Sequence, residues 1–243
     1  ARENATYTEN EFHILDVGCG TGALFGFYIK VAEAKGITVH IHGLDLSEKM
    51  VQKAQAYGTE LLSKVTTQRP HSIRVDQGDI CQWEPQDESS PSSPHYEYDL
   101  VVANACFGNF WDPAQALHCM TKALRLDGLL CITHPLGSSF VKQLHENDPS
   151  TVPHLLPTVP NFEQMARTLP LANLQIVDKD EEDTSSSSYF MASATKVVYH
   201  TLPQIMRLRG TVDTGYGRGG KKLGFPTANL PSRLFQNALQ DVP

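Results

Sequence analysis

The chain has 243 residues and 40% hydrophobic side chains, which fits one or two soluble globular domains. Its formal charge of −7 at pH 7 argues against a nucleic-acid or membrane-surface partner, because both present negative charge. No apolar run approaches the roughly 18 residues of a membrane span. The five cysteines include no CxxC pair, so we expect reduced thiols in an intracellular, cytoplasmic protein. The first residue is Ala1 and not Met, so an organellar leader upstream stays open.

Short apolar runs alternate with longer amphipathic segments as far as His134. In chain order we expect a strand at 13–19, a helix at 23–36, a strand at 38–46, a helix capped by Ser47, strands at 71–79 and 98–106, a helix at 113–128 and a strand at 128–134. This alternation is typical of βαβ units, and it predicts an α/β fold with a doubly wound, mostly parallel sheet. The 98–106 strand is very apolar, which predicts a central place in the sheet.

The pattern changes in the later part of the chain. We expect a short helix at 161–170 and then two strands, 174–182 and 188–199, with no helix between them. Two consecutive strands of this kind predict an antiparallel hairpin at one edge of the sheet. Two proline-rich stretches, 85–97 and 149–160, are either variable surface loops or lids over a site.

Three glycines, Gly18, Gly20 and Gly22, lie in ILDVGCGTG at the turn from the first strand to the first helix. A doubly wound sheet binds nucleotides at this turn, and glycine lets the ligand approach the backbone. With Ala23 the same residues also satisfy the GxGxxG/A dinucleotide pattern, so the glycines alone do not choose the cofactor. Asp16 favours S-adenosylmethionine, because a carboxylate attracts its sulfonium and ammonium groups and would repel a diphosphate.

Two further acids follow successive strands. Asp45 follows the second strand, where a carboxylate can accept hydrogen bonds from both ribose hydroxyls. Asp79 follows the third strand, where it could accept a hydrogen bond from the adenine amino group while Ile80 packs on the ring. Each acid could also be an ordinary cap or turn residue.

The motifs LDVGCGTG, GLDLSEKM, GDI and YDLVVANA, in this order, resemble those of class I S-adenosylmethionine-dependent methyltransferases. The resemblance runs over about residues 12 to 200, and it implies a methyltransferase-like domain at 1–200 with a seven-stranded sheet. The cofactor contacts that it implies are Asp16, Gly18, Gly20, Gly22, Asp45, Leu46, Asp79 and Ile80. Asn104 matches the position that often faces the methyl group. That family usually has a helical segment before the first strand, so we expect this segment to lie upstream or the cofactor site to be unusually open.

The expected reaction is methyl transfer to an acceptor that the sequence does not name, with a small molecule favoured over a nucleic acid. A general base is needed only if the acceptor arrives protonated. Asn104 and His134 are the catalytic candidates. Asn104 could orient the acceptor or hold the methionine end of the cofactor, and His134 could be the base or could simply hydrogen-bond the next loop. We expect Cys106 to belong to the core. His40 and His42 share one face of a strand, and without a third ligand we interpret them as structural. A dehydrogenase or a non-catalytic nucleotide-binding module is the competing interpretation.

The glycine-rich, basic stretch GYGRGGKKLGFPTANL at 215–230 could form an anion nest or a plain surface turn. Together with the residues before it, LRGTVDT, it resembles the N-terminal part of riboflavin kinase over about 203–243, which implies a second domain at 201–243 holding the start of a β-barrel. The nucleotide contacts that it implies are Gly217, Arg218, Gly219, Lys222, Thr227 and Asn229, with Thr227 also at Mg²⁺. The alternative function is therefore phosphorylation of riboflavin with Mg-ATP by a longer parent protein. We expect the chain to be a fragment of a real fusion or of two neighbouring genes joined in error.

Overall fold

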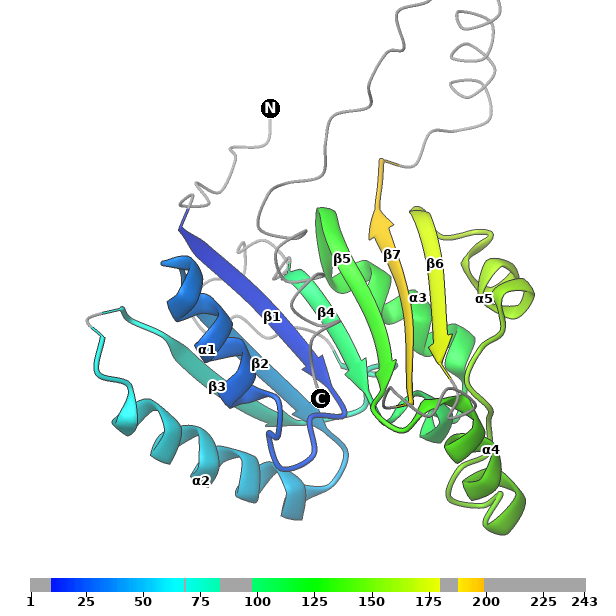
Figure 1. Cartoon of the computed structure of the whole chain (residues 1–243), viewed down its shortest axis with the longest axis horizontal. Coiled ribbons are helices and arrows are strands. Elements are labelled where there is room, and N and C mark those ends of the chain that lie inside the picture. Colours follow the sequence, from blue (N-terminus) through cyan, green and yellow to red (C-terminus); the bar gives the residue numbers. More distant parts are fainter. Residues whose placement is uncertain (1–9, 68, 84–97, 180–187, 199–243) are drawn as a thin grey trace, which may run out of the picture.

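The fold is a single twisted sheet with helices on both faces (Figure 1). The computed structural model describes residues 10–67, 69–83, 98–179 and 188–198. Within them the strands are β1 (Glu11–Val17), β2 (Thr38–Asp45), β3 (Ser72–Gln77), β4 (Tyr98–Asn104), β5 (Leu124–His134), β6 (Leu171–Lys179) and β7 (Tyr189–Lys196). Their order is β3-β2-β1-β4-β5-β7-β6, and β7 is the strand whose direction is opposite to that of the others. This confirms the doubly wound sheet, the central place of β4 and the antiparallel edge hairpin.

The helices in the described part of the chain are α1 (Phe25–Lys35), α2 (Glu48–Lys64), the 3₁₀ turn η1 (Phe107–Asn109), α3 (Pro113–Ala123), α4 (Gly137–Asn147) and α5 (Val159–Ala166). α1 ends at Gly36, whose φ of 70° lets its N–H reach the last carbonyls of the helix. α3 begins with Pro113 after Asp112, whose carboxylate accepts from the Gln115 N–H at 2.9 Å. Ser47 precedes α2, although its side chain makes no capping hydrogen bond.

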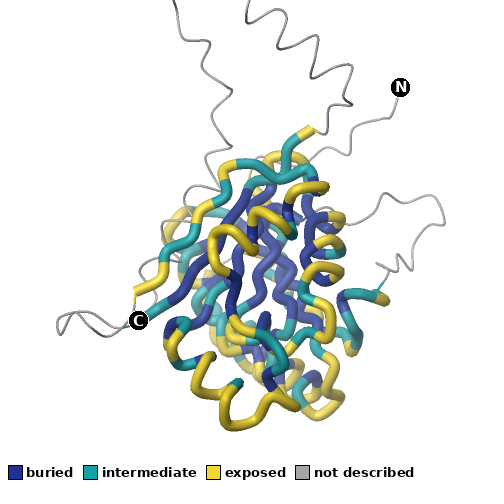
Figure 2. Tube along the Cα trace, turned by 90° about the vertical axis from the view of Figure 1, so that its right-hand side faces the viewer, coloured by how far each residue is buried: buried dark blue, intermediate teal, exposed yellow. Residues whose placement is uncertain are grey.

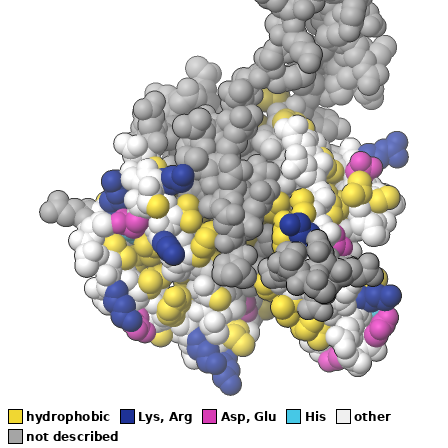
Figure 3. Space-filling view, in the orientation of Figure 1, with side chains coloured by type: hydrophobic (Ala, Val, Ile, Leu, Met, Phe, Trp, Pro, Cys, Tyr) yellow, Lys and Arg dark blue, Asp and Glu magenta, His cyan; other side chains and the backbone are white. Residues whose placement is uncertain are grey.

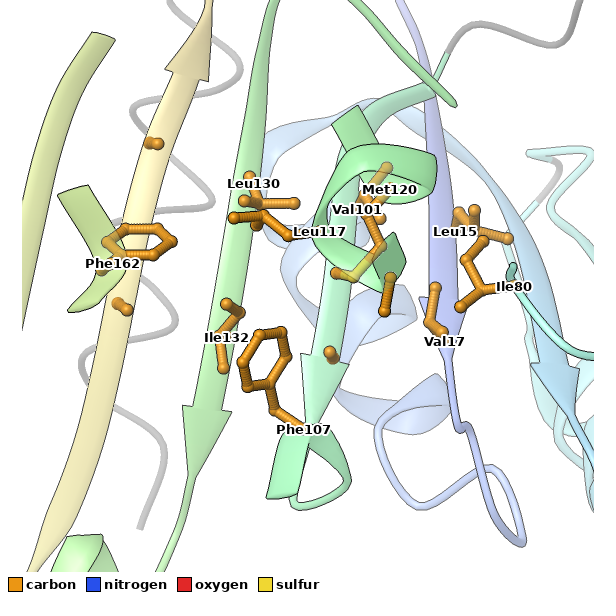
Figure 4. Close-up of a cluster of buried hydrophobic side chains, with 14 of the residues drawn as sticks. Leu15, Val17, Ile80, Val101, Phe107, Leu117, Met120, Leu130, Ile132 and Phe162 are labelled. Atoms are coloured by element: carbon orange, nitrogen blue, oxygen red, sulfur yellow. The ribbon is translucent and has the colours of Figure 1, made fainter. Parts of the chain in front are cut away.

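Two apolar clusters hold the helices to the sheet. α1 and α2 pack on one face, and α3, α5 and η1 pack on the other. In the second cluster Leu117 and Met120 of α3 lie against Leu130 and Val101 of the central strands, and Phe162 of α5 lies against β7 (Figure 4). The sheet is thereby buried between exposed outer turns (Figure 2). No helix in the described ranges combines the length and the apolar character that crossing a bilayer requires.

One expected helix ends elsewhere than predicted, and one helix was not predicted. The helix expected at 113–128 ends at Ala123, and β5 begins at Leu124, because Leu124 is fully buried and pairs with Tyr98. A register shift follows in this ladder, and Asp127 takes a φ of 62°. The sequence analysis also missed α4, which lies between β5 and the proline-rich stretch at 149–160. The other such stretch, 85–97, and the riboflavin-kinase-like segment lie outside the described residues.

Candidate active site

The glycine turn lies across the carboxyl end of β2. The Gly18 and Cys19 N–H groups both donate to the Leu44 carbonyl, at 2.7 and 3.1 Å. Gly18, Gly20 and Gly22 all have positive φ, between 57° and 82°, which L-residues adopt at a cost. A Cβ on Gly18 would come within 2.7 Å of the Cys106 Sγ, whereas a Cβ on Gly20 would meet nothing within 4 Å. Gly18 is therefore required by packing, and Gly20 leaves open space above the backbone where a ligand can approach.

Asp45 fixes this turn from the neighbouring strand. Its Oδ2 accepts from the Gly20 N–H at 2.8 Å, and its Oδ1 accepts from the Ser47 N–H at 2.9 Å. A carboxylate has about four acceptor positions, so each oxygen keeps capacity for a further donor such as a ribose hydroxyl. The structure thus places Asp45 beside the open side of Gly20, and contact with the ribose hydroxyls stays a prediction.

Asp16 lies beneath the turn and not on its surface. It is 2% exposed, and burial raises the pKa of its carboxyl to about 7. The Tyr28 hydroxyl opposes this rise, and the nearby Asp45 carboxylate adds to it. Asp16 is therefore poised to ionise near neutral pH. A cation bound above the turn would favour its charged form.

Asp79, Ile80 and Leu46, the residues that we predict on the adenine side, differ in how much of their side chains is accessible. Asp79 uses its Oδ1 to accept the Cys81 N–H at 2.9 Å, and it lines a hollow of about 570 Å³ at the end of β3 together with Trp83. Ile80 is only 3% exposed and belongs to the apolar cluster of Leu44 and its neighbours, so it has little surface to offer a ring. Leu46 is 67% exposed and directly follows Asp45, so it has more accessible apolar surface than Ile80.

Beyond the glycine turn, the carboxyl ends of β4 and β5 form the second part of the site. Asn104 is half-buried, and its Oδ1 accepts from the Thr133 hydroxyl at 2.9 Å, which leaves its amide N–H groups as donors. The next residue, Ala105, has a φ of 55°, which is unusual for a residue with a side chain. Strained backbone of this kind is concentrated at functional sites. No sequence signal marked Ala105, because alanine does not indicate a left-handed residue.

A cavity of about 260 Å³ opens beside this strained residue. Its lining comes from the ends of β4 and β5, η1, α4 and the start of the proline-rich stretch: Ala105, Gly108, Asn109, His134, Val141, Leu144, Asp148, Thr151 and Val152. The proline-rich stretch is held to η1 by hydrogen bonds from Asn109 Nδ2 to the Thr151 carbonyl and from the His154 N–H to the Gly108 carbonyl. Part of this stretch, at Thr151 and Val152, therefore forms one wall of the cavity.

His134 lines the cavity with one ring nitrogen already engaged. Its Nδ1 accepts from the Leu136 N–H at 3.2 Å, and burial lowers the pKa of the ring. A neutral imidazole that accepts at Nδ1 carries its proton on Nε2, which is then a donor. The geometry therefore suits His134 to donate a hydrogen bond better than to act as the base. Cys106 donates its thiol to the Val17 carbonyl at 3.2 Å, and burial raises its pKa, as expected of a packing residue.

Comparison with known proteins identifies the family. The family described as Methyltransferase domain matches residues 8–186, and the chain belongs to this family. Over 143 residues the chain is 27% identical to a malonyl-[acyl-carrier protein] O-methyltransferase of Paenibacillus sp. (strain JDR-2), covering 59% of this chain and 45% of that protein. A second family, described as Riboflavin kinase, matches residues 202–240. Over 34 residues the chain is 53% identical to riboflavin kinase of Mus musculus, covering 14% of this chain and 22% of that protein. The matches thus span less than half of these relatives.

Solved structures show the same fold. A SAM-dependent methyltransferase from Methanosarcina mazei superposes with a TM-score of 0.53 at 14% identity, covering 79% of this chain and 96% of that one. Phosphoethanolamine N-methyltransferase 2 of Haemonchus contortus, in complex with S-adenosyl-L-methionine, gives 0.53 at 16% identity, covering 79% and 50%. The fold is therefore the Rossmann-like methyltransferase fold. The kinase-like residues Gly217, Arg218, Gly219, Lys222, Thr227 and Asn229 lie outside the described residues.

Proposed function

We propose that this domain binds S-adenosylmethionine along the glycine turn and transfers its methyl group to a small acceptor in the cavity beside Ala105. The observation that carries the proposal is the open approach to Gly20 next to the Asp45 carboxylate. Two acids at this turn, Asp16 beneath and Asp45 beside it, favour a cationic ligand over a diphosphate. The family and the fold support the same cofactor.

The cofactor, when bound, supplies a methyl group that is already activated by its sulfonium, so the protein contributes mainly proximity and alignment. Asn104 offers amide donors at the end of β4, and His134 offers its Nε2–H from the cavity wall. Asp148 is a poor base, because hydrogen bonds from Ser150 and Thr151 lower the pKa of its carboxyl to about 2. The cavity residues are therefore suited to orient an acceptor that arrives with its lone pair available.

The size of the cavity limits the acceptor. Pockets for drug-sized ligands usually measure about 300–1,000 Å³. At about 260 Å³ this cavity suits a small molecule or one small arm of a larger one. Among the described residues, Lys and Arg side chains are dispersed over the face seen in Figure 3.

Calorimetric titration with S-adenosylmethionine tests the proposal. We expect Asp45→Ala to weaken binding at least about tenfold, because a hydrogen bond to a charged group contributes about 1.5 kcal/mol or more. Glu60→Gln, an exposed acid on α2 that pairs with Lys64, is the matched control and should leave binding unchanged. Equal affinities for the wild type and Asp45→Ala, with unchanged circular dichroism, would reject this placement of the cofactor.

Riboflavin phosphorylation is the second candidate, and it concerns a longer protein. The family match at 202–240 is the reason to consider it, but the 34 residues that match the mouse enzyme cover only 22% of that enzyme, so we assign no kinase activity to this chain. In a protein that continues beyond residue 243, Thr227→Ala should abolish formation of FMN from riboflavin and Mg-ATP. Full activity of that variant would show that Thr227 does not hold the metal.

A further inference from the structure

The amino-terminal ends of β1 and β2 bring together three side chains that can ligate a metal. Glu11, His13 and His40 each offer one ligand atom, and these atoms all lie within 4.8 Å of one another. The parallel register places His13 opposite His40, and Glu11 lies two residues earlier, on the same face of β1. The two imidazole rings stack with their centroids 4.7 Å apart and an angle of 24° between their planes.

We propose that Glu11, His13 and His40 bind a divalent transition metal, with Zn²⁺ as the best fit to two imidazoles and one carboxylate. A tetrahedral zinc ion with bonds of about 2.0–2.1 Å keeps its ligand atoms about 3.3 Å apart, so the three atoms would need to close in by at most about 1.5 Å. Glu11 is exposed and both histidines are half-buried, so side-chain rotation out of the stack can supply this movement. Three protein ligands leave the fourth position to water.

The surroundings of the histidines support ligation. The His40 Nδ1 lies 2.8 Å from the Ser72 Oγ of β3, which leaves Nε2 for the metal. Metal-binding histidines usually have their other nitrogen held by an oxygen in this way. The backbone of His13 is fixed as well, since its N–H donates to the Asp99 carboxylate at 2.7 Å.

His42, two residues after His40 on the same strand, has both ring nitrogens within hydrogen-bond distance of other side chains. Its Nδ1 lies 2.6 Å from the Tyr98 hydroxyl, and its Nε2 lies 2.8 Å from the Asp76 carboxylate. His42 is therefore structural, as we predict for both His40 and His42. For His40 the interpretation changes because β-sheet pairing supplies His13 and Glu11 from the adjacent strand.

The place of the cluster in the fold indicates what the metal would do. It lies at the amino-terminal ends of the parallel strands, whereas the glycine turn lies at their carboxyl ends (Figure 1). The metal would link β1 to β2 and stabilise the folded state without taking part in methyl transfer. The inference is therefore independent of the proposed function.

Titration of the purified chain with Zn²⁺ in the calorimeter, under reducing conditions, tests the inference. We expect one ion per chain, and we expect Glu11→Gln, His13→Gln and His40→Gln each to weaken binding at least about tenfold. His118→Gln, an exposed histidine on α3, is the matched control and should bind as the wild type does. Substitution with Co²⁺ should give a visible d–d spectrum without the near-ultraviolet thiolate band that cysteine ligands produce.

Three results would overturn the inference. The first is the absence of stoichiometric Zn²⁺ binding by the wild type. The second is binding that survives Glu11→Gln or His40→Gln, and the third is a thiolate band with Co²⁺, since either of these would place the metal elsewhere. Circular dichroism of each variant checks its fold, and Glu11→Gln alters only an exposed side chain, so that variant remains informative if His13→Gln unfolds.

Discussion

The pKa of Asp16 makes cofactor binding depend on pH in a direction that identifies the charge of the ligand. A buried carboxyl with a pKa of about 7 is mostly neutral at pH 5.5 and half ionised at pH 7. A cationic ligand binds the ionised form better, so its affinity should rise with pH over this interval. If only the ionised form binds, the ionised fraction grows from about 3% to about 50%, and the affinity grows about fifteenfold.

Calorimetry with S-adenosylmethionine at pH 5.5, 6.2 and 7 measures this slope. In this interval the α-amino group of the ligand stays protonated, since such groups titrate at about 7.7–8.0. The Cys19 thiol beside the turn does not interfere, because burial raises its pKa to about 12. Asp16→Asn should bind with an affinity that no longer depends on pH, while Glu60→Gln should keep the slope of the wild type. An affinity that is constant or falls with rising pH in the wild type would refute the reasoning.

The same carboxyl should also affect folding stability. Its folded pKa lies above the unfolded value of 3.8, so the folded state holds the proton more tightly. This stabilisation of the folded state is present at low pH and is lost as pH rises from about 4 to 7. Above that range the loss of unfolding free energy is on the order of 4 kcal/mol. Asp16→Asn should therefore unfold at a higher temperature than the wild type at pH 8 and at a similar temperature at pH 4. A lower unfolding temperature for Asp16→Asn at pH 8 would show that ionised Asp16 contributes to stability.

Four other substitutions separate packing from chemistry. Gly18→Ala combines a positive φ with a 2.7 Å clash, whereas Gly20→Ala bears only the backbone strain of about 1–2 kcal/mol. In urea unfolding, Gly18→Ala should therefore lose clearly more stability than Gly20→Ala. Equal losses of unfolding free energy would contradict this. Arg125→Met leaves the buried Asp99 without its ion-pair partner and should cost about 3–5 kcal/mol of unfolding free energy, and a loss below about 1 kcal/mol would contradict the pairing. His134→Gln keeps a donor and should retain most methyl transfer across pH 6–8, whereas abolished activity would restore His134 as the base.

Much of the fold follows from local sequence patterns. The apolar runs and the stop at Gly36 predict β1, α1 and β2 within a few residues, because period and caps there agree with the tertiary structure. The boundary between α3 and β5 does not follow, because long-range contacts decide it. Leu124 is buried opposite Tyr98, and Arg125 pairs with Asp99, and neither contact is visible in the local pattern.

The candidate site was predictable to a similar extent. The glycines and Asp45 are marked by their spacing after strands, and the structure brings them together. The burial of Ile80 and the strained Ala105 depend on how the carboxyl ends of the strands pack, which spacing does not reveal. The cluster at Glu11 depends on strand order and register in the same way.

The most direct test of the cofactor assignment is a crystal structure of the protein soaked with S-adenosylmethionine and NADH together. We expect electron density for S-adenosylmethionine against Gly20, with its ribose hydroxyls within hydrogen-bond distance of the Asp45 carboxylate. Density for the diphosphate of NADH at the glycine turn, with no bound S-adenosylmethionine, would contradict the proposal.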